Sequence, residues 1–292
     1  MDSAGAASVT RLLSVRREGG RGKINQTNNM RNVADSMQSR DSDSIAPELI
    51  QASFKDHKVQ PDRPFSYVRE RVMEGRVVIL KNAFSPDLML QLRRALIEWS
   101  QTHPPYPQGK SPNSTPMENY HRVDDGVIRS ALPHIFHQFG LNSIDQLVPS
   151  LRGPVNIVAQ AMLEVENEVA GTHFDFSLTG LRMKVLHYPA GGGFLQEHTH
   201  PLEPQRVGLV LSASKLDTDV STGGTYFLSP FGRVEAAAYH DIGDLILFRY
   251  DIPHGVSRVD EHSTLDWRSE AGKWSVVLDL RETHVQSGTP AG

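Results

Sequence analysis

The feature that most restricts the fold is a change of sequence period near residue 181. Beyond it, short segments rich in β-branched and aromatic residues alternate with turns that contain Gly, Pro and Asp. Short strands joined by such turns predict antiparallel pairing in a sandwich or barrel. The expected strands are 181–188, 206–213, 224–228, 244–250 and 274–281.

The chain before residue 181 predicts mainly helices. Apolar residues recur at helical spacing after Ser85-Pro86, which supplies an N-cap and a first-turn proline. Five prolines in 102–119 exclude a helix there and indicate a loop, which together with residues 120–125 is a candidate lid. The expected elements are helices at 64–74 (ended by Gly75), 86–100 and most of 126–171 (ended by Gly171), and a strand at 76–81.

Composition excludes several classes of protein. The chain has 292 residues and no cysteine, which rules out disulfide scaffolds, zinc-thiolate sites, iron–sulfur clusters and a thiol nucleophile. Its formal net charge of −4 argues against a nucleic-acid partner. No stretch approaches the roughly 18 apolar residues of a membrane span, so we expect no membrane partner and a cytoplasmic protein.

The domain organisation follows from these patterns. Residues 1–45 are polar and without apolar period, and they predict a disordered leader or an overlong start. We expect one domain over 46–286, made of a helical layer with the lid (46–175) and a β-core (176–286), followed by a flexible tail at 287–292.

Histidines carry the chemistry of the β-core. His198-Thr199-His200 places two imidazoles on one face of an extended segment, and nearby glycines and Pro201 allow the bend that a shared ion needs. His254 follows the buried-looking strand 244–250. Three neutral imidazoles suit Fe(II), Zn(II), Cu(II) or Ni(II), so the spacing predicts a metal site.

The sequences around these histidines resemble a known superfamily. In order, the chain reads VLHYPAGGGFLQEHTH, Gly-Gly-Thr-Tyr-Phe, GDLILFRYDIPHGV and GKWSVVLDLRE within about 180–282. This order is similar to that of the iron(II)- and 2-oxoglutarate-dependent oxygenases, on the prolyl-4-hydroxylase-like side. The segment 76–96 also resembles the strand and helix that precede the core in those enzymes.

The resemblance implies a fold class and a metal site. The fold would be an all-β core with flanking helices, namely a double-stranded β-helix (a jelly-roll or cupin-like barrel) behind an N-terminal helical layer. Fe(II) would lie at one open end of the barrel. His198 would be the first metal ligand and His254 the distal one.

The resemblance also implies a cosubstrate site. Lys273, in the sequence Gly-Lys-Trp, would hold the far carboxylate of 2-oxoglutarate, because a buried ammonium needs an anion. Ser275 lies two residues on, shares its face and could donate a second hydrogen bond. Tyr188 could add a phenol donor, and Arg268 is a rival anchor.

One position departs from the family pattern. The family has Asp or Glu two residues after the first histidine, whereas this chain has His200. His200 could ligate and give a three-histidine site, or it could turn away and leave two histidines with water or an anion. Glu197 or Glu203 could also substitute, although Glu197 should point away from His198 on a regular strand.

The expected function is that of an oxygenase using O₂ and 2-oxoglutarate to hydroxylate or otherwise oxidise an unidentified, small-molecule substrate. Two alternatives stay open. One is a cupin-like three-histidine metalloenzyme without a cosubstrate, such as a dioxygenase or isomerase. The other is a catalytically silent binding module.

Overall fold

The computed structural model describes residues 44–105, 117–123, 133–141, 149–176 and 181–280. Nearly all of the expected leader, the tail at 287–292 and much of the expected lid lie outside the described residues. The three described α-helices are α2 (Phe65–Met73), α3 (Pro86–Thr102) and α4 (Pro149–Ala170). None of the described helices is both long and apolar enough to cross a membrane.

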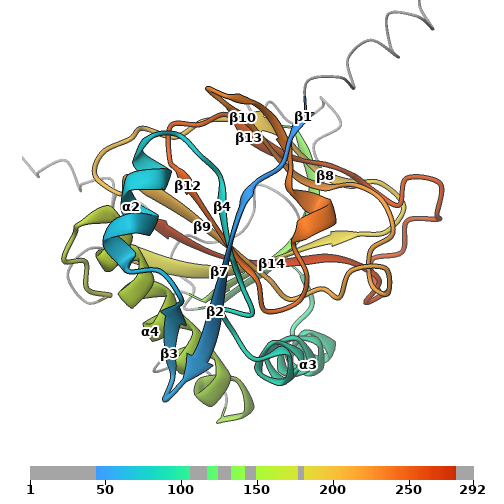
Figure 1. Cartoon of the computed structure of the whole chain (residues 1–292). Helices are drawn as coiled ribbons and strands as arrows, with labels where there is room; N and C mark the ends of the chain where they lie inside the picture. Colours follow the sequence, from blue (N-terminus) through green and yellow to red (C-terminus); the bar gives the residue numbers. More distant parts are fainter. Residues whose placement is uncertain (1–43, 106–116, 124–132, 142–148, 177–180, 281–292) are drawn as a thin grey trace, which may run out of the picture. The chain divides into compact units, whose positions relative to one another are not determined.

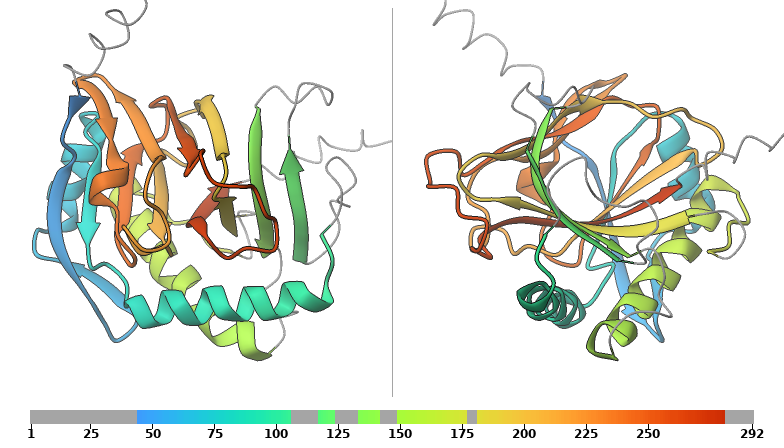
Figure 2. Two further views of the ribbon diagram at one scale, coloured as in Figure 1. Left: turned by 90° about the vertical axis from the view of Figure 1, so that its right-hand side faces the viewer. Right: turned by 180° about the vertical axis from the view of Figure 1, so that it is seen from behind.

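Two antiparallel sheets face each other in the β-core (Figures 1 and 2). We call one the helix-side sheet and the other the histidine sheet. The helix-side sheet has the order β7 (Leu181–Pro189), β14 (Gly272–Leu280), β9 (Val207–Ser212) and β12 (Leu245–Arg249). The histidine sheet has the order β8 (Gly193–His198), β13 (His254–Val259), β10 (Gly224–Ser229) and β11 (Gly232–Glu235).

Successive strands pass from one sheet to the other, apart from the β10–β11 hairpin. This alternation of antiparallel strands is the double-stranded β-helix that the family resemblance implies. Strand β6 (His134–Leu141) pairs with both β7 and β8 and so links the two sheets along one side. On the other side, β4 (Val78–Lys81) extends the helix-side sheet beyond β12, as expected for the strand at 76–81.

The remaining strands lie at the margins of the two sheets. β2 (Glu48–Lys55) pairs in parallel with β4, and β3 (Lys58–Pro61) pairs with β2. β1 (Ser44–Ile45) pairs in parallel with β11, and β5 (Met117–Val123) pairs with β6. A short 3-10 helix, η3 (Ala236–Tyr239), follows β11.

The expected N-terminal helical layer is therefore only partly helical. Helices α2, α3 and α4 form close to the predicted positions, and Gly75 and Gly171 follow the ends of α2 and α4 with positive φ. Ser85 occupies the N-cap of α3, but its side chain does not make the capping hydrogen bond. The helical prediction for 126–171 is wrong for residues 134–141, which form β6.

The largest core lies between the helices and the outer face of the helix-side sheet (Figure 2). Strand β14 shows how one strand serves two environments. Trp274, Val276 and Leu278 are buried in the core that contains the helices. Because side chains alternate along a strand, Lys273 and Ser275 face the space between the two sheets. The alternation therefore sets which side chains of β14 can contribute to the site between the sheets.

The turn before β10 gives a test of this architecture. Gly223 has φ +81°, and a Cβ there would lie 2.2 Å from the Arg258 carbonyl oxygen. Replacing Gly223 with Ala should lower the free energy of unfolding by about 2 kcal/mol through backbone strain. Gly153 in α4 has open space around it, so Gly153→Ala should raise stability by about 0.5–1 kcal/mol. Urea denaturation of both variants measures the difference, and equal effects would contradict the described turn.

Candidate metal centre

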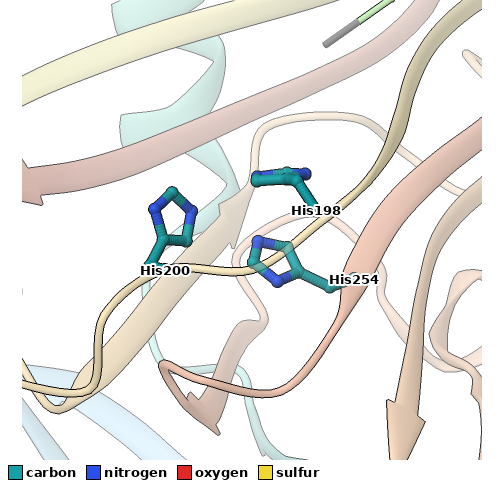
Figure 3. A group of neighbouring side chains, drawn as sticks. All are labelled: His198, His200 and His254. Carbon is teal, nitrogen blue, oxygen red and sulfur yellow. The ribbon is translucent and has the colours of Figure 1, made fainter. Parts of the chain in front are cut away.

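Three histidines converge at one end of the space between the sheets (Figure 3). His198 ends β8, His254 begins β13, and His200 lies just beyond β8. One ring nitrogen from each lies within 4.8 Å of those of the other two. The structure thus brings together the three residues that the sequence singles out, and their role as metal ligands stays a prediction.

Strand pairing produces this convergence. His254 is the direct partner of His198 across the β8–β13 ladder. The next paired residues are Val256 and Leu195, so β8 uses three steps where β13 uses two. The extra residue is a β-bulge, which re-aims side chains. As a result, Leu195 and His198 both line the same cavity, although three steps on a regular strand would separate their faces.

The local backbone fixes the ring nitrogens that are free to bind an ion. His198 Nδ1 lies 3.0 Å from the Gln196 carbonyl oxygen, and His254 Nδ1 lies 2.9 Å from the Ile252 carbonyl oxygen. A carbonyl can only accept, so both Nδ1 atoms carry the proton and donate it. In the neutral rings the lone pair is then on Nε2. This second hydrogen bond is typical of metal-ligating histidines.

Burial favours the neutral, metal-binding form of the histidines. It lowers the pKa of His254 to about 3 and that of His200 to about 4, with the neighbouring His198 adding to both shifts. The pKa of His198 is also lowered, again mainly by burial. The His200 ring stacks on the Tyr250 ring at 4.2 Å and 8°, which fixes its orientation. Cu(II), Zn(II) and Fe(II) all accept such a donor set.

Neither glutamate considered as a substitute ligand joins the three histidines. Glu197 is exposed, as strand alternation predicts. Glu203 is exposed and forms an ion pair with Arg206 at 3.3 Å. Among the described residues, the group that could hold an ion consists of histidines alone.

A cavity of about 240 Å³ extends from the histidines between the two sheets. Its walls are mainly apolar, but two buried hydroxyls face it from opposite sheets. Ser275 Oγ on β14 and Thr225 Oγ1 on β10 are both buried without a hydrogen-bond partner. Buried polar groups are normally paired, so these atoms indicate a place for a polar ligand. Tyr188, also expected here, lines the same cavity and is buried.

Lys273 lies two residues before Ser275 on β14, on the same face of the strand, but it does not line the histidine cavity. It lines a second cavity of about 20 Å³ and is only 4% exposed. Burial lowers the pKa of its ammonium group to about 8. Its Nζ lies 3.5 Å from His240 Nδ1, and within the described residues no carboxylate forms an ion pair with it.

His240 is a neutral neighbour of this lysine. Its Nε2 lies 3.0 Å from the Asp244 carbonyl oxygen, so Nε2 carries the proton and Nδ1 is an acceptor. Burial and the Lys273 charge lower the pKa of His240 well below its usual value. The Lys273 charge is therefore solvated by one imidazole and is not neutralised by it. A buried ammonium in this state has a strong preference for an anion.

Arg268 is not brought to either cavity. It is exposed in the segment between β13 and β14, where its backbone N–H donates to Asp266. Of the two basic residues considered for a carboxylate, only Lys273 is buried between the sheets.

The sequence reasoning missed several residues of the cavity. Thr225 was visible within the Gly-Gly-Thr-Tyr-Phe motif, but the motif did not reveal its role. Asp279 had a signal as well, because it shares the inward face of Lys273 on β14. The contributions of β6 could not be found while that segment was interpreted as helical. The missed polar and charged lining residues are Thr225, Lys184, Tyr250, Asp279, His134 and Gln138.

Comparisons with known proteins give structural neighbours only. No family model and no curated protein matches the chain. A prolyl-4-hydroxylase from Pseudomonas putida is 14% identical with a TM-score of 0.48, covering 74% of this chain and 98% of that one. An oxidoreductase of the 2OG-Fe(II) oxygenase family from Burkholderia pseudomallei is 13% identical with a TM-score of 0.45, covering 80% and 94%.

A third structure is the non-heme alpha ketoglutarate dependent epimerase SnoN from nogalamycin biosynthesis. It is 8% identical with a TM-score of 0.48 and covers 73% of this chain and 79% of that one. These structures are of the kind that the sequence motifs indicate. At such identities and TM-scores the likeness carries no argument about activity, which must rest on the residues of this chain.

The depressed histidine pKa values predict acid sensitivity of the metal-free protein. In the unfolded chain these histidines bind protons below about pH 6.5, whereas in the folded protein they bind protons only near their lowered pKa values of about 4 for His200 and about 3 for His254. The free energy of unfolding should therefore fall as pH falls through this window, by up to about 1.4 kcal/mol per pH unit for each histidine. Urea denaturation with chelator from pH 7.5 to 5 measures the slope. The His254→Gln variant should show a shallower slope, and parallel slopes would contradict the burial described.

Proposed function

We propose that this chain is an Fe(II)- and 2-oxoglutarate-dependent oxygenase that oxidises a small-molecule substrate. The observation that carries the proposal is the presence of two complementary features between the same two sheets. Three neutral imidazoles meet around one point. The ammonium group of Lys273 is buried without a carboxylate partner among the described residues. A metal ion would suit the imidazoles, and a carboxylate of its cosubstrate would suit the ammonium group.

When bound, Fe(II) with 2-oxoglutarate and O₂ would supply a two-electron oxidation of the substrate, with release of succinate and CO₂. His198, His200 and His254 would hold the metal through their unprotonated ring nitrogens. The apolar cavity walls would exclude water from the reacting groups. The protein would thus provide orientation and a dry pocket.

The cosubstrate tail would extend past Ser275 and Thr225 in the histidine cavity towards Lys273 in the second cavity. Ser275 and Thr225 each have an unsatisfied hydroxyl that can donate to a carboxylate. Lys273 lies two residues from Ser275 on the same face, about 7 Å along β14. Its ammonium group would exchange the contact with His240 for the carboxylate, which pairs the buried charge.

A direct spectroscopic test exists for this function. Anaerobic protein with Fe(II) and 2-oxoglutarate should develop a weak visible charge-transfer band, and admission of O₂ should yield succinate. The His254→Ala variant should abolish both signals, because it removes a proposed ligand. If the wild-type protein shows neither the band nor oxygen-dependent succinate, the cosubstrate proposal is wrong.

A second candidate is a three-histidine metalloenzyme that needs no cosubstrate. It is favoured by the position of His200, whose ring nitrogen belongs to the same 4.8 Å group as the other two histidines. The two candidates differ in the use of Lys273. Lys273→Ala should abolish 2-oxoglutarate binding if the chain is a 2-oxoglutarate oxygenase, whereas it should leave a cosubstrate-independent activity nearly unchanged.

The lowered pKa of Lys273 predicts a pH limit for cosubstrate binding. The 2-oxoglutarate affinity should be constant below pH 8 and fall about tenfold per pH unit above it, because only the ammonium form attracts the carboxylate. Lys273→Arg keeps its charge at alkaline pH and should bind without this decline. Calorimetric titration of the Mn(II)-loaded proteins from pH 7 to 9.5 measures both curves. Identical pH profiles would show that Lys273 does not hold the tail.

A further inference from the structure

An ion pair lines the histidine cavity from the opposite sheet. Asp279 on β14 and Lys184 on β7 form this salt bridge, and their side chains are 24% and 15% exposed. Both residues contribute to the wall of the cavity that contains His198, His200 and His254. None of the cosubstrate contacts proposed above uses this pair.

Tyr250 connects Asp279 to the metal centre. The Tyr250 hydroxyl donates to Asp279 Oδ1 at 3.4 Å, a long hydrogen bond, while its ring stacks on His200. Burial first, then the charge of Asp279, raises the pKa of Tyr250 well above its usual value, so the phenol keeps its proton and remains a donor. One carboxylate is thus linked through one phenol ring to one of the three imidazoles.

A metal bound by three neutral imidazoles keeps its full double positive charge. In the family that the sequence resembles, the residue at position 200 would be a carboxylate and would cancel part of that charge. Transfer of an uncompensated charge into an apolar cavity is costly. Within the described part of the chain no carboxylate joins the three histidines, and Asp279 is an acidic side chain that lines their cavity.

We propose that Asp279 supplies from the opposite sheet the negative charge that His200 does not provide, acting as a positioning residue and not as a direct ligand. The inference rests on the proposed metal role of the three histidines. Lys184 compensates Asp279 while no cation is bound, which explains how a carboxylate persists in a largely apolar cavity. A bound divalent ion then adds a second favourable partner for the same carboxylate.

Metal affinity without cosubstrate tests this role. Asp279→Asn keeps the shape of the side chain and an acceptor oxygen for Tyr250, but removes the charge. We expect it to weaken Mn(II) or Co(II) binding about 10–100-fold, the usual effect of losing an outer-shell partner. Lys184→Met removes the competing cation and should strengthen binding. Competition with a chromophoric chelator at pH 7.5 measures both affinities.

Two further variants separate charge compensation from a structural role. Glu203→Gln removes an exposed carboxylate near the same histidines in sequence and should leave metal affinity unchanged. His200→Asp in the Asp279→Asn background returns a carboxylate to the centre and should restore affinity towards the wild-type value. A structural ion pair would instead make Asp279→Asn and Lys184→Met lose stability alike, without moving metal affinity in opposite directions.

The outcomes are distinguishable from those of the proposed function. If the wild-type protein binds no divalent metal, both the proposed function and this inference are wrong. If it binds metal and Asp279→Asn binds equally well, only the role of Asp279 is overturned. A weakened Asp279→Asn that His200→Asp restores supports it, whereas a weakened variant without restoration overturns charge compensation.

Discussion

The pairing of β8 with β13 is the contact on which the site depends. It sets His198 opposite His254, although the two residues are far apart in the sequence. A one-residue slip in this ladder would turn one imidazole out of the cavity, since strand side chains alternate between faces. The bulge between His198 and Leu195 has a related effect, because it brings both side chains to the wall of the histidine cavity. Backbone register alone thus brings His198 and His254 together.

Regular strands were the part of the site that the sequence could predict. Along β14 the alternation places Trp274 in the helix-covered core and Lys273 with Ser275 between the sheets. The same alternation on β7 places Tyr188, a donor that the resemblance implies, at the cavity wall, and it places His187 on the other face, where its ring stacks on Trp274. These predictions succeed because an unbroken strand has a fixed period of two.

The other parts of the site depend on strands that are distant in the sequence, and the local residue pattern gives no information about such pairing. Residues 134–141 were expected within a helical region, but they form β6, which pairs with both β7 and β8. The bulge in β8 has no local signature, so alternation alone would place Leu195 and His198 on opposite faces. The role of Asp279 was equally hidden, because it depends on Lys184 and Tyr250 from two other strands.

The two sheets contribute different kinds of group to the cavity. The histidine sheet and the segment after β8 supply neutral imidazoles, whereas the helix-side sheet supplies Lys184 and Asp279 to the same cavity and Lys273 to the second, smaller cavity. That charged sheet is also the one whose outer face packs against the helices. A charged side chain in an apolar cavity must be held in a fixed position to interact well with a ligand. Dense packing of the helix-side sheet against the helices provides this rigidity.

Selectivity for a diacid would follow from the same arrangement. Lys273 is buried beside a neutral His240, and no described carboxylate pairs with it. A keto acid without a distal carboxylate would fill the space near Ser275 and Thr225 but leave the ammonium uncompensated and cut off from water. The cost of leaving the Lys273 charge unpaired discriminates strongly against acids that lack the distal carboxylate. Under the proposed function, the cavity around Lys273 would therefore select the cosubstrate chiefly because an acid without a second carboxylate leaves the ammonium group unpaired.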